Sequence, residues 1–374
     1  MELIYRDINE AVVGTLDHLQ TFGKDVPSRN GQSRELLYHD FAIQYPQARN
    51  IYLDGRTNNF FATVAETIWI MAGSNKLDPV ISFFLPRARD YSDDGYTWTN
   101  GYGRKLFLGG QFDSVIREFR AAKDTRRAVM SVWNPYDDTL HSLQSKGIEN
   151  PKDMSCTTSI TFIIREDALE MKVHMRSNDV LFGMSHINIF EYTFLQEALV
   201  SILRADYPTL KMGKYRHSVQ SLHAYDTVGE QCIKIRNSEL NRGRDFDPSD
   251  YRPLLMPPAD NLGGTNVTYN FNRFFRNILR EYEVAINTMT PDNWTQNLLD
   301  RVESIRANFD VFECPTEGNV MWDYAMVPLL WISKSRCAGD RHDPMRPLVA
   351  HMSESVRQAV CWSKSGALMH LARP

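Results

Sequence analysis

The sequence predicts an α+β fold, with a mixed β-sheet covered by helices and a mainly helical C-terminal part. Residues 159–175 alternate apolar and polar side chains in two runs, which is typical of a β-hairpin. Residues 188–203 are apolar on nearly every side, as expected for a helix in the centre of a domain. Further helical patterns follow near the C-terminus, without the regular strand–helix alternation of a parallel sheet.

The first part of the chain contains two predicted helices and one predicted strand. The asparagine pair at 58–59 precedes the apolar residues 60–72 and can cap a helix there, which Gly73 would end. Residues 111–122 have helical periodicity, and residues 128–133 are predicted to form a strand.

The predicted hairpin brings its two ends together. Its strands are residues 159–165 and 169–175, with a polar turn between them. Cys156 stands just before the first strand, and Arg176 directly follows the second. Because the two ends of a hairpin lie side by side, we expect this thiol and this guanidinium to be neighbours.

The composition changes after residue 236. Residues 237–264 are rich in Arg, Asp, Pro, Asn and Gly, which predicts a loop or linker. We therefore divide the chain into a core at 1–236 and an extended, mostly helical region at 237–374, packed on the core or completing it. The helical patterns of this second region are residues 271–288, 294–309 and 352–370.

Composition and charge limit the class of protein. The 374 residues are 43% hydrophobic and 24% charged, enough to bury a sizeable core in one large domain or two. The formal net charge of −4 argues against a protein that holds nucleic acid by bulk electrostatics. A small anionic ligand remains compatible with this charge, because a local arginine cluster needs no positive excess.

The same composition predicts a cytoplasmic location. The N-terminal residues lack the basic-then-apolar pattern of a signal peptide. No apolar run approaches the roughly 18 residues of a membrane span. Five widely spaced cysteines fit reduced cytosolic thiols better than a disulfide framework or a CxxC metal site, and the histidines show no metal-ligand spacing. We expect neither a membrane, a nucleic acid nor a metal as partner.

Cys156 is the candidate nucleophile. A single cysteine is usually a small buried apolar residue, and that interpretation remains open. Its sequence neighbours Ser155 and Thr157 are polar, however, and the nearby Arg176 would raise the thiolate fraction by lowering the thiol pKa.

Four arginines are candidates for an anion clamp. Arg29 adjoins a flexible Asn-Gly pair, Arg126 and Arg127 precede the strand predicted at 128–133, and Arg176 ends the hairpin. Arginine makes planar, bidentate contacts to phosphate. Solvated surface charge is the alternative for the adjacent pair.

Three other polar residues stand in apolar patterns. Glu66 lies in an apolar helix, where a carboxylate normally points to solvent or pairs with a base. If Glu66 faces a cavity instead, burial raises its pKa and makes it a proton relay. His223 and Tyr225 alternate on a strand predicted at 218–225, so both face the same side. They either hold a sugar hydroxyl or are core residues with partners elsewhere.

In chain order, these residues resemble the thymidylate synthase family, including its pyrimidine nucleotide hydroxymethylase branch. The resemblance runs from about residue 29 to residue 225, and six motifs in the right order make it specific. The motifs are Ala65-Glu66-Thr67-Ile68-Trp69, Asn100-Gly101-Tyr102-Gly103, Asp124-Thr125-Arg126-Arg127 with Trp133-Asn134-Pro135, Met154-Ser155-Cys156, Met175-Arg176-Ser177-Asn178-Asp179 and Ser221-Leu222-His223-Ala224-Tyr225.

The resemblance implies one-carbon transfer to a pyrimidine nucleoside monophosphate. The Cys156 thiolate would add to C6 of the base, so that C5 attacks the methylene carbon of 5,10-methylenetetrahydrofolate. Glu66 would relay protons through ordered water, and Tyr102 would assist removal of the C5 proton.

The resemblance also implies a phosphate site that two subunits share. Arg29 and Arg176 of one subunit would hold the phosphate together with Ser177. Arg126 and Arg127 would reach the same phosphate from the second subunit. We therefore expect a homodimer with phosphate arginines crossing its interface.

The remaining implied contacts concern the sugar and the folate. His223 and Tyr225 would hold the 3′-hydroxyl, and Asp179 would lie toward the folate. Ser177 favours a deoxyribose, as in the deoxynucleotide enzymes of the family.

Two departures from the usual family pattern favour hydroxymethylation. Thr157 follows the nucleophile where thymidylate synthases typically have His. Asn178, in Arg-Ser-Asn-Asp, resembles the phage deoxycytidylate hydroxymethylases. In that branch water, instead of hydride from the folate, captures the methylene carbon, and the products are a 5-hydroxymethyl nucleotide and tetrahydrofolate.

Asn188 predicts uracil as the base. The family places Asn here for uracil and Asp for cytosine, and an amide offers both a donor and an acceptor to O4 and N3–H. One extra residue stands between Gly183 and Asn188, and a strict count puts Ile187 at the recognition position. Cytosine therefore remains an alternative.

Together these observations predict hydroxymethylation of dUMP to 5-hydroxymethyl-dUMP, in the host cytoplasm if the protein is viral. The alternatives are a thymidylate synthase that makes dTMP and a hydroxymethylase acting on dCMP or CMP. A non-catalytic homologue that binds nucleotide, or a partner protein through residues 237–374, is the alternative from another class.

Overall fold

The computed structural model describes residues 2–28, 31–99, 101–242, 246–247, 250–258, 260–262, 266–337, 343–363, 368 and 371. One mixed sheet has the strand order β1-β3-β8-β6-β5-β4, with β2 paired to β3 and β7 paired to β8. The β3–β8 and β5–β6 pairs are antiparallel, whereas β6–β8 is parallel. The strands are Ile4–Tyr5, Lys24–Ser28, Gly31–Ile43, Val129–Ser131, Thr157–Arg165, Ala168–Met175, Asn178–Asp179 and Lys211–Tyr225, for β1 to β8.

The predicted hairpin is the pair β5–β6. Glu166 and Asp167 form its turn, both with positive φ, of 50° and 57°. Positive φ at both central residues matches the twist of the flanking strands, and Asp tolerates that conformation better than most residues. The buried residues of β6 alternate, so one face of the hairpin packs into the core and the other is half-exposed.

Helix α7, Ile189–Leu203, crosses the buried face of the sheet and is itself buried on nearly every side, as its sequence predicts. The residues before it, Val180–Asn188, form a π-helical segment. A π-helical turn takes up an additional residue within a helix. This segment therefore provides the place for the extra residue between Gly183 and Asn188.

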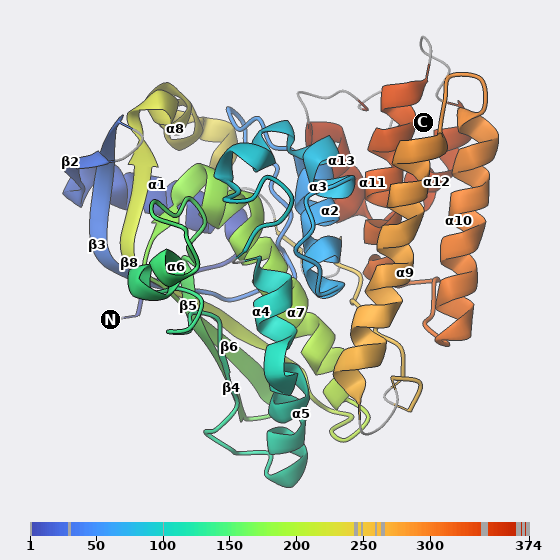
Figure 1. The fold of residues 1–374 in the computed structure, drawn as a ribbon, viewed down its shortest axis with the longest axis horizontal. Helices are drawn as coiled ribbons and strands as arrows, with labels where there is room; N and C mark the ends of the chain where they lie inside the picture. The colour runs from blue at the N-terminus through green and yellow to red at the C-terminus, as the bar shows by residue number, and fades with distance from the viewer. Residues whose placement is uncertain are drawn as a thin grey trace.

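Helix α2, Phe60–Met71, begins and ends where the sequence predicts. The Asn59 side chain accepts a hydrogen bond from the Ala62 amide, and Gly73 follows the helix with a φ of 69°. In Figure 1, α2 lies between the sheet and the C-terminal helices, and it contacts α7, α9 and α11. Glu66 is thereby carried into the centre of the molecule.

The other helices surround this arrangement. In the N-terminal part of the chain they are α1 Ile8–Phe22, α3 Val80–Phe84, α4 Tyr102–Phe107, α5 Gln111–Ala121, α6 Leu140–Ser145 and α8 Gly229–Asn237. The C-terminal helices are α9 Val267–Thr288, α10 Trp294–Val311, α11 Val320–Arg336, α12 Arg346–His351 and α13 Glu354–Trp362. None of the helices described combines the length and the apolar character needed to cross a membrane.

The C-terminal region packs on the helix that carries Glu66. The Asn272 side chain of α9 donates a hydrogen bond to the Met71 carbonyl at the end of α2, at 2.7 Å. The rings of Phe61 in α2 and Trp331 in α11 are stacked with centroids 5.0 Å apart. The two regions thus share packed contacts, and the division of the chain at residue 236 stays a prediction.

Several elements differ from the sequence predictions. Strand β3 and helix α1 were not predicted, and β4 is shorter than the strand expected at 128–133. Helix α11 was missed because it is apolar on most sides and contains Pro328, so its sequence carries little helical periodicity. The helix expected at 352–370 begins at Glu354, after α12 has ended at His351, and it ends at Trp362.

Candidate active site

A cavity of about 400 Å³ lies where α2, the hairpin and the π-helical segment meet. Its walls come from distant parts of the sequence, and the fold brings most of the predicted site residues to it. The predicted residues that line it are Glu66, Tyr102, Cys156, Ser177, Asp179, Asn188, His223 and Tyr225.

Cys156 and Arg176 are neighbours, as the hairpin geometry predicts. The Arg176 amide donates to the Cys156 carbonyl at 2.8 Å, and its Nη2 lies 3.9 Å from the Cys156 Sγ. The Arg176 guanidinium also donates to the Ser155 and Met154 carbonyls, at 2.9 and 3.0 Å. A guanidinium beside a thiol stabilises the thiolate, which is the nucleophilic form.

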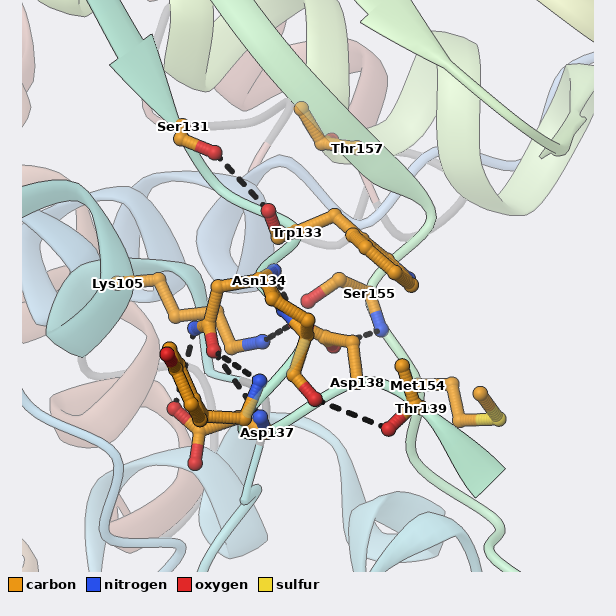
Figure 2. A network of polar contacts seen from close by, with 12 residues as sticks. Lys105, Ser131, Trp133, Asn134, Asp137, Asp138, Thr139, Met154, Ser155 and Thr157 are labelled. Carbon is orange, nitrogen blue, oxygen red and sulfur yellow. Dashed lines mark hydrogen bonds and ion pairs between the residues drawn. The ribbon is translucent and has the colours of Figure 1, made fainter. Parts of the chain in front are cut away.

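A buried ion pair holds the segment that leads to Cys156. Lys105 of α4 and Asp138 are buried and paired with each other. The Asp138 carboxylate also accepts from the Ser155 amide at 3.3 Å and from the Asn134 amide at 2.9 Å. Figure 2 shows Lys105, Asn134 and Ser155 converging on Asp138. Asp138 thus links the backbone before Cys156 to the helix that begins with Tyr102, and the sequence reasoning did not identify it.

Glu66 faces the cavity from α2. Burial of its carboxyl raises the pKa of Glu66 from an ordinary value near 4.5 to about 8. A carboxyl with such a pKa exchanges protons close to neutral pH, which suits a proton relay.

Tyr102 lies close to the nucleophile strand. Its hydroxyl accepts a hydrogen bond from the Thr157 amide at 3.3 Å. The Thr157 side chain is buried and shares a hydrogen bond of 2.6 Å with the Tyr192 hydroxyl. Burial raises the pKa of Tyr102 well above 10, so the phenol is neutral and keeps its proton.

Asp179 begins the π-helical segment. Its Oδ1 accepts from the Leu181 amide at 2.8 Å and from the Phe182 amide at 2.5 Å. Burial raises the pKa of this carboxyl, while the two amides and His223 act in the opposite direction. The other oxygen, Oδ2, is buried and has no hydrogen-bond partner among the described residues.

Asn188 and Ile187 both line the cavity. Asn188 is 5% exposed and is anchored, because its Nδ2 donates to the Glu191 Oε1 at 3.0 Å. Ile187 has no polar group to offer to a base. Ile187 and Asn188 are the two candidates for the base-recognition position. Of these, Asn188 therefore has the side chain that can form hydrogen bonds with the polar edge of a base.

Glu191 is a cavity residue that the sequence reasoning missed. It is fully buried in α7, one turn after Asn188, and lines the same wall. The sequence does carry a signal for Glu191: it is a carboxyl within residues 188–203, a predicted helix that is apolar on nearly every side.

The buried Asn178 also lines the cavity. Its side-chain amide contacts the ring of His217, with 3.0 Å between Nδ2 and Nε2.

His223 and Tyr225 lie on the same face of β8, as predicted. Their rings are in edge contact, with centroids 5.0 Å apart. His223 is paired in register with Asp179 of β7. Ser177 lies just before that strand, so these polar groups surround one end of the cavity.

The predicted arginines within the described residues, Arg126, Arg127 and Arg176, are not among those that line this cavity, and Arg176 lines a separate hollow beside Thr158 and His174. Arg127 is exposed and pairs with Glu118 at 2.9 Å. Arg126 is exposed and lines a separate hollow together with Lys172 and Arg216. Arg29 lies outside the described residues.

Comparisons with known proteins agree with the motifs. The thymidylate synthase family model matches residues 52–245. A deoxyuridylate hydroxymethyltransferase of Delftia phage PhiW-14 is 36% identical over 330 residues, which cover 87% of this chain and 85% of that protein. A protein of the same name from Bacillus phage SP01 is 26% identical, over 78% of this chain and 74% of that protein. A T4 phage thymidylate synthase structure, 20% identical, has a TM-score of 0.47 over 61% of this chain and 80% of that one.

The family model covers more than half of the chain, and the PhiW-14 relative extends the similarity into the C-terminal helices. The six motifs quoted above all lie within the matched range and, where the structure describes them, most meet at the cavity. The chain therefore belongs to the thymidylate synthase family of one-carbon transferases.

Proposed function

We propose that this enzyme hydroxymethylates C5 of dUMP, with 5,10-methylenetetrahydrofolate as the one-carbon donor and water as the group that completes the product. The observation that carries the proposal is that Cys156 and Asn188 line one cavity. A thiol for C6 and an amide for the N3–H and O4 edge of uracil are thus available to one bound base. The 36% identity to a phage deoxyuridylate hydroxymethyltransferase supports the same reaction.

The cavity residues fit a folate. Trp69 and Trp98 line the cavity with their rings in edge contact, and Phe182 adds an exposed ring at its rim. Flat aromatic groups of a ligand stack on such side chains. The unpartnered Oδ2 of Asp179 offers an acceptor for N–H groups of a pterin ring. When bound, the folate supplies the carbon that is transferred.

The chain's own residues account for the other steps. The Cys156 thiolate forms a bond to C6, and the electron pair of the C5–C6 double bond moves toward C5 and O4. Glu66, through water, and Tyr102 take part in removing the C5 proton after the carbon has been transferred. With the C5 proton removed, the bond between that carbon and the folate nitrogen would break and tetrahydrofolate would leave. Water then adds to the carbon and loses a proton, and the C6–S bond breaks to return the thiolate.

The proposed enzyme works as a homodimer. Arg176 holds the phosphate near Cys156, together with Arg29 and Ser177, and Arg126 and Arg127 of a second subunit complete the clamp. The exposed position of Arg126 and Arg127, away from their own cavity, supports this arrangement. The phage relatives support a place of action in the cytoplasm of the bacterial host.

Mass analysis of the product tests the proposed function. The enzyme is incubated with dUMP, dCMP or CMP and methylenetetrahydrofolate, and the nucleotide is weighed by mass spectrometry. A hydroxymethyl gain on dUMP with formation of tetrahydrofolate is expected. A methyl gain with formation of dihydrofolate would instead identify a thymidylate synthase, and a hydroxymethyl gain on cytosine nucleotides alone would refute the role of Asn188.

Tritium release tests whether the protein is an enzyme on these substrates at all. With the folate present, 5-tritiated dUMP is expected to lose its label to water, since every route through a C5 nucleophile removes that hydrogen. Absence of release from both 5-tritiated dUMP and dCMP would favour a homologue that only binds nucleotide.

A further inference from the structure

Glu191 is a buried carboxyl of the cavity to which the proposed reaction assigns no part. It lies on α7 three residues after Asn188 and is 0% exposed. Burying a carboxyl costs free energy unless partners compensate for its lost hydration. Because Glu191 lines the cavity, a bound ligand can provide part of that compensation.

Only one of the two Glu191 oxygens has a hydrogen-bond partner among the described residues. Oε1 accepts from the Asn188 Nδ2 at 3.0 Å. Oε2 is buried and without a partner in that part of the chain. The side chain is therefore held on one side and unsatisfied on the other.

Burial keeps this carboxyl neutral. Desolvation raises the pKa of Glu191 well above 4.5, and the charge of Glu66 adds to the effect, while the hydrogen bond from Asn188 opposes it. In a neutral carboxylic acid one oxygen accepts and the other carries a proton. Because Oε1 accepts from Asn188, Oε2 is the hydroxyl and thus a donor that lacks an acceptor.

The Asn188 amide indicates which substrate atom lies nearby. An asparagine that reads uracil places its NH₂ group at O4 and its oxygen at N3–H. The same Nδ2 contacts Glu191, so Glu191 lies on the O4 side of the base. The Asn188 Oδ1 faces Gly183, where an added methyl group would come within 3.1 Å of it, so a glycine leaves that oxygen accessible.

We propose that the Glu191 hydroxyl donates a hydrogen bond to O4 of the bound uracil, beside the amide of Asn188. This inference rests on the proposed function, since it takes uracil as the base. Addition of the Cys156 thiolate to C6 places negative charge on O4, and addition of water to the transferred carbon places it there again. Each charge is withdrawn from O4 in the step that follows, first by bond formation at C5 and then by loss of the thiolate.

Donors placed in advance where charge develops lower the barrier of such steps. A carboxylic acid kept neutral by its surroundings is an established kind of donor to an enolate oxygen. Uracil can accept at O4 from both Asn188 and Glu191, because a carbonyl oxygen has two lone pairs.

Two substitutions test whether Glu191 donates a hydrogen bond, acts as a base or is only structural. Glu191→Gln keeps the shape, an acceptor for Asn188 and a donor for O4, but cannot act as a base. Glu191→Leu keeps much of the volume and removes the donor. We expect kcat for dUMP to fall about 100-fold in Glu191→Leu, the usual loss for one such donor, and to stay within about tenfold in Glu191→Gln. Tritium release from 5-tritiated dUMP is expected to follow kcat, because the donor acts on C5 activation.

Two results would overturn the donor role. Equal loss of kcat in both variants means that Glu191 acts as an ionised base. Unchanged kcat in folded Glu191→Leu means that the carboxyl is only structural. Circular dichroism and urea titration confirm folding, and dUMP affinity measured without folate separates binding from turnover.

Glu197→Gln is the matched control. Glu197 is a buried carboxyl of the same helix, but it pairs with Arg49 and accepts from the Leu254 amide at 2.9 Å, away from the cavity. We expect Glu197→Gln to change stability without lowering kcat below that of Glu191→Gln.

The product of the wild type is determined first. If the wild type methylates dUMP, the test of the Glu191 donor still stands, because uracil is still the base. If it modifies only dCMP, the proposed function fails independently of the Glu191 variants.

Discussion

At the scale of single residues, the ionisation of Glu66 is expected to make the stability of the protein depend on pH. Its carboxyl has a pKa of about 8 in the folded protein, against an ordinary value near 4.5. The folded state therefore binds the proton more tightly than the unfolded state, so wild-type stability falls as pH rises from about 4.5 to about 8. Glu66→Gln lacks this fall, so its stability relative to wild type is expected to rise by about 4 kcal/mol between pH 4 and pH 8.

Urea unfolding at several pH values checks this expectation. The difference between Glu66→Gln and wild type should be near zero at pH 4 and should grow up to pH 8. A constant difference across that range would show that the folded-state pKa of Glu66 is not raised.

Cys156 carries the covalent step of the proposed mechanism. Cys156→Ala is expected to lose turnover by at least about 1,000-fold, because none of the described residues that line the cavity offers a second thiol. Affinity for dUMP, measured by calorimetry, should change little, since the sulfur contributes little of the contact area. Measurable turnover at wild-type levels would contradict covalent catalysis.

At the scale of elements, the ion pair between Lys105 and Asp138 joins α4 to the segment before β5. Removing one partner of a buried pair leaves an uncompensated charge, which typically costs 3–5 kcal/mol. We therefore expect Asp138→Ala to lose about 3 kcal/mol of unfolding free energy by urea titration. It also frees the Ser155 amide, so alkylation of Cys156 by iodoacetamide should change in rate even where the protein remains folded.

Asp137→Ala is the control for this network. Asp137 belongs to the same loop, but its side chain is 33% exposed and its partner Lys146 is 47% exposed. Exposed pairs contribute little, so a loss below about 1 kcal/mol is expected. Similar losses in both variants would mean that the buried pair does not anchor the segment.

The elements show where sequence patterns suffice. Helix α2 and hairpin β5–β6 were predicted because a cap, a turn and a regular period coincide in each. Helix α11 was not, because it is surrounded by other helices and its burial removes the polar face that makes a helix recognisable. Strand β3 was missed for another reason, since Gln32, Arg34 and Glu35 are polar and its apolar Leu37 and Tyr38 are exposed, so it lacks a regular alternation.

At the scale of the whole molecule, subunit mixing tests the proposed dimer. Arg126→Ala,Arg127→Ala subunits and Cys156→Ala subunits should each be inactive alone. A mixed dimer unites the intact thiol of one subunit with the intact arginines of the other. After the two are unfolded and refolded together, activity should return to about a quarter of wild type, because half of the dimers are mixed and each has one complete site.

The mixing result has a clear alternative. If all phosphate contacts come from within one subunit, no combination of the two variants can restore activity. Sedimentation at the assay concentration provides the control, because a monomeric wild type would exclude shared sites before any mixing.

The sequence by itself determined the family, the α+β fold and the hairpin that sets Cys156 beside Arg176, because these depend on local periods and on the order of motifs. The family and fold predictions are confirmed, and the roles of individual residues stay predictions. The tertiary structure decided which of Ile187 and Asn188 is anchored for reading a base, because only packing reveals a π-helical segment before α7. It also revealed Glu191 and Asp138, because burial in the cavity wall singles out the first and an ion pair with a residue far away in the sequence singles out the second.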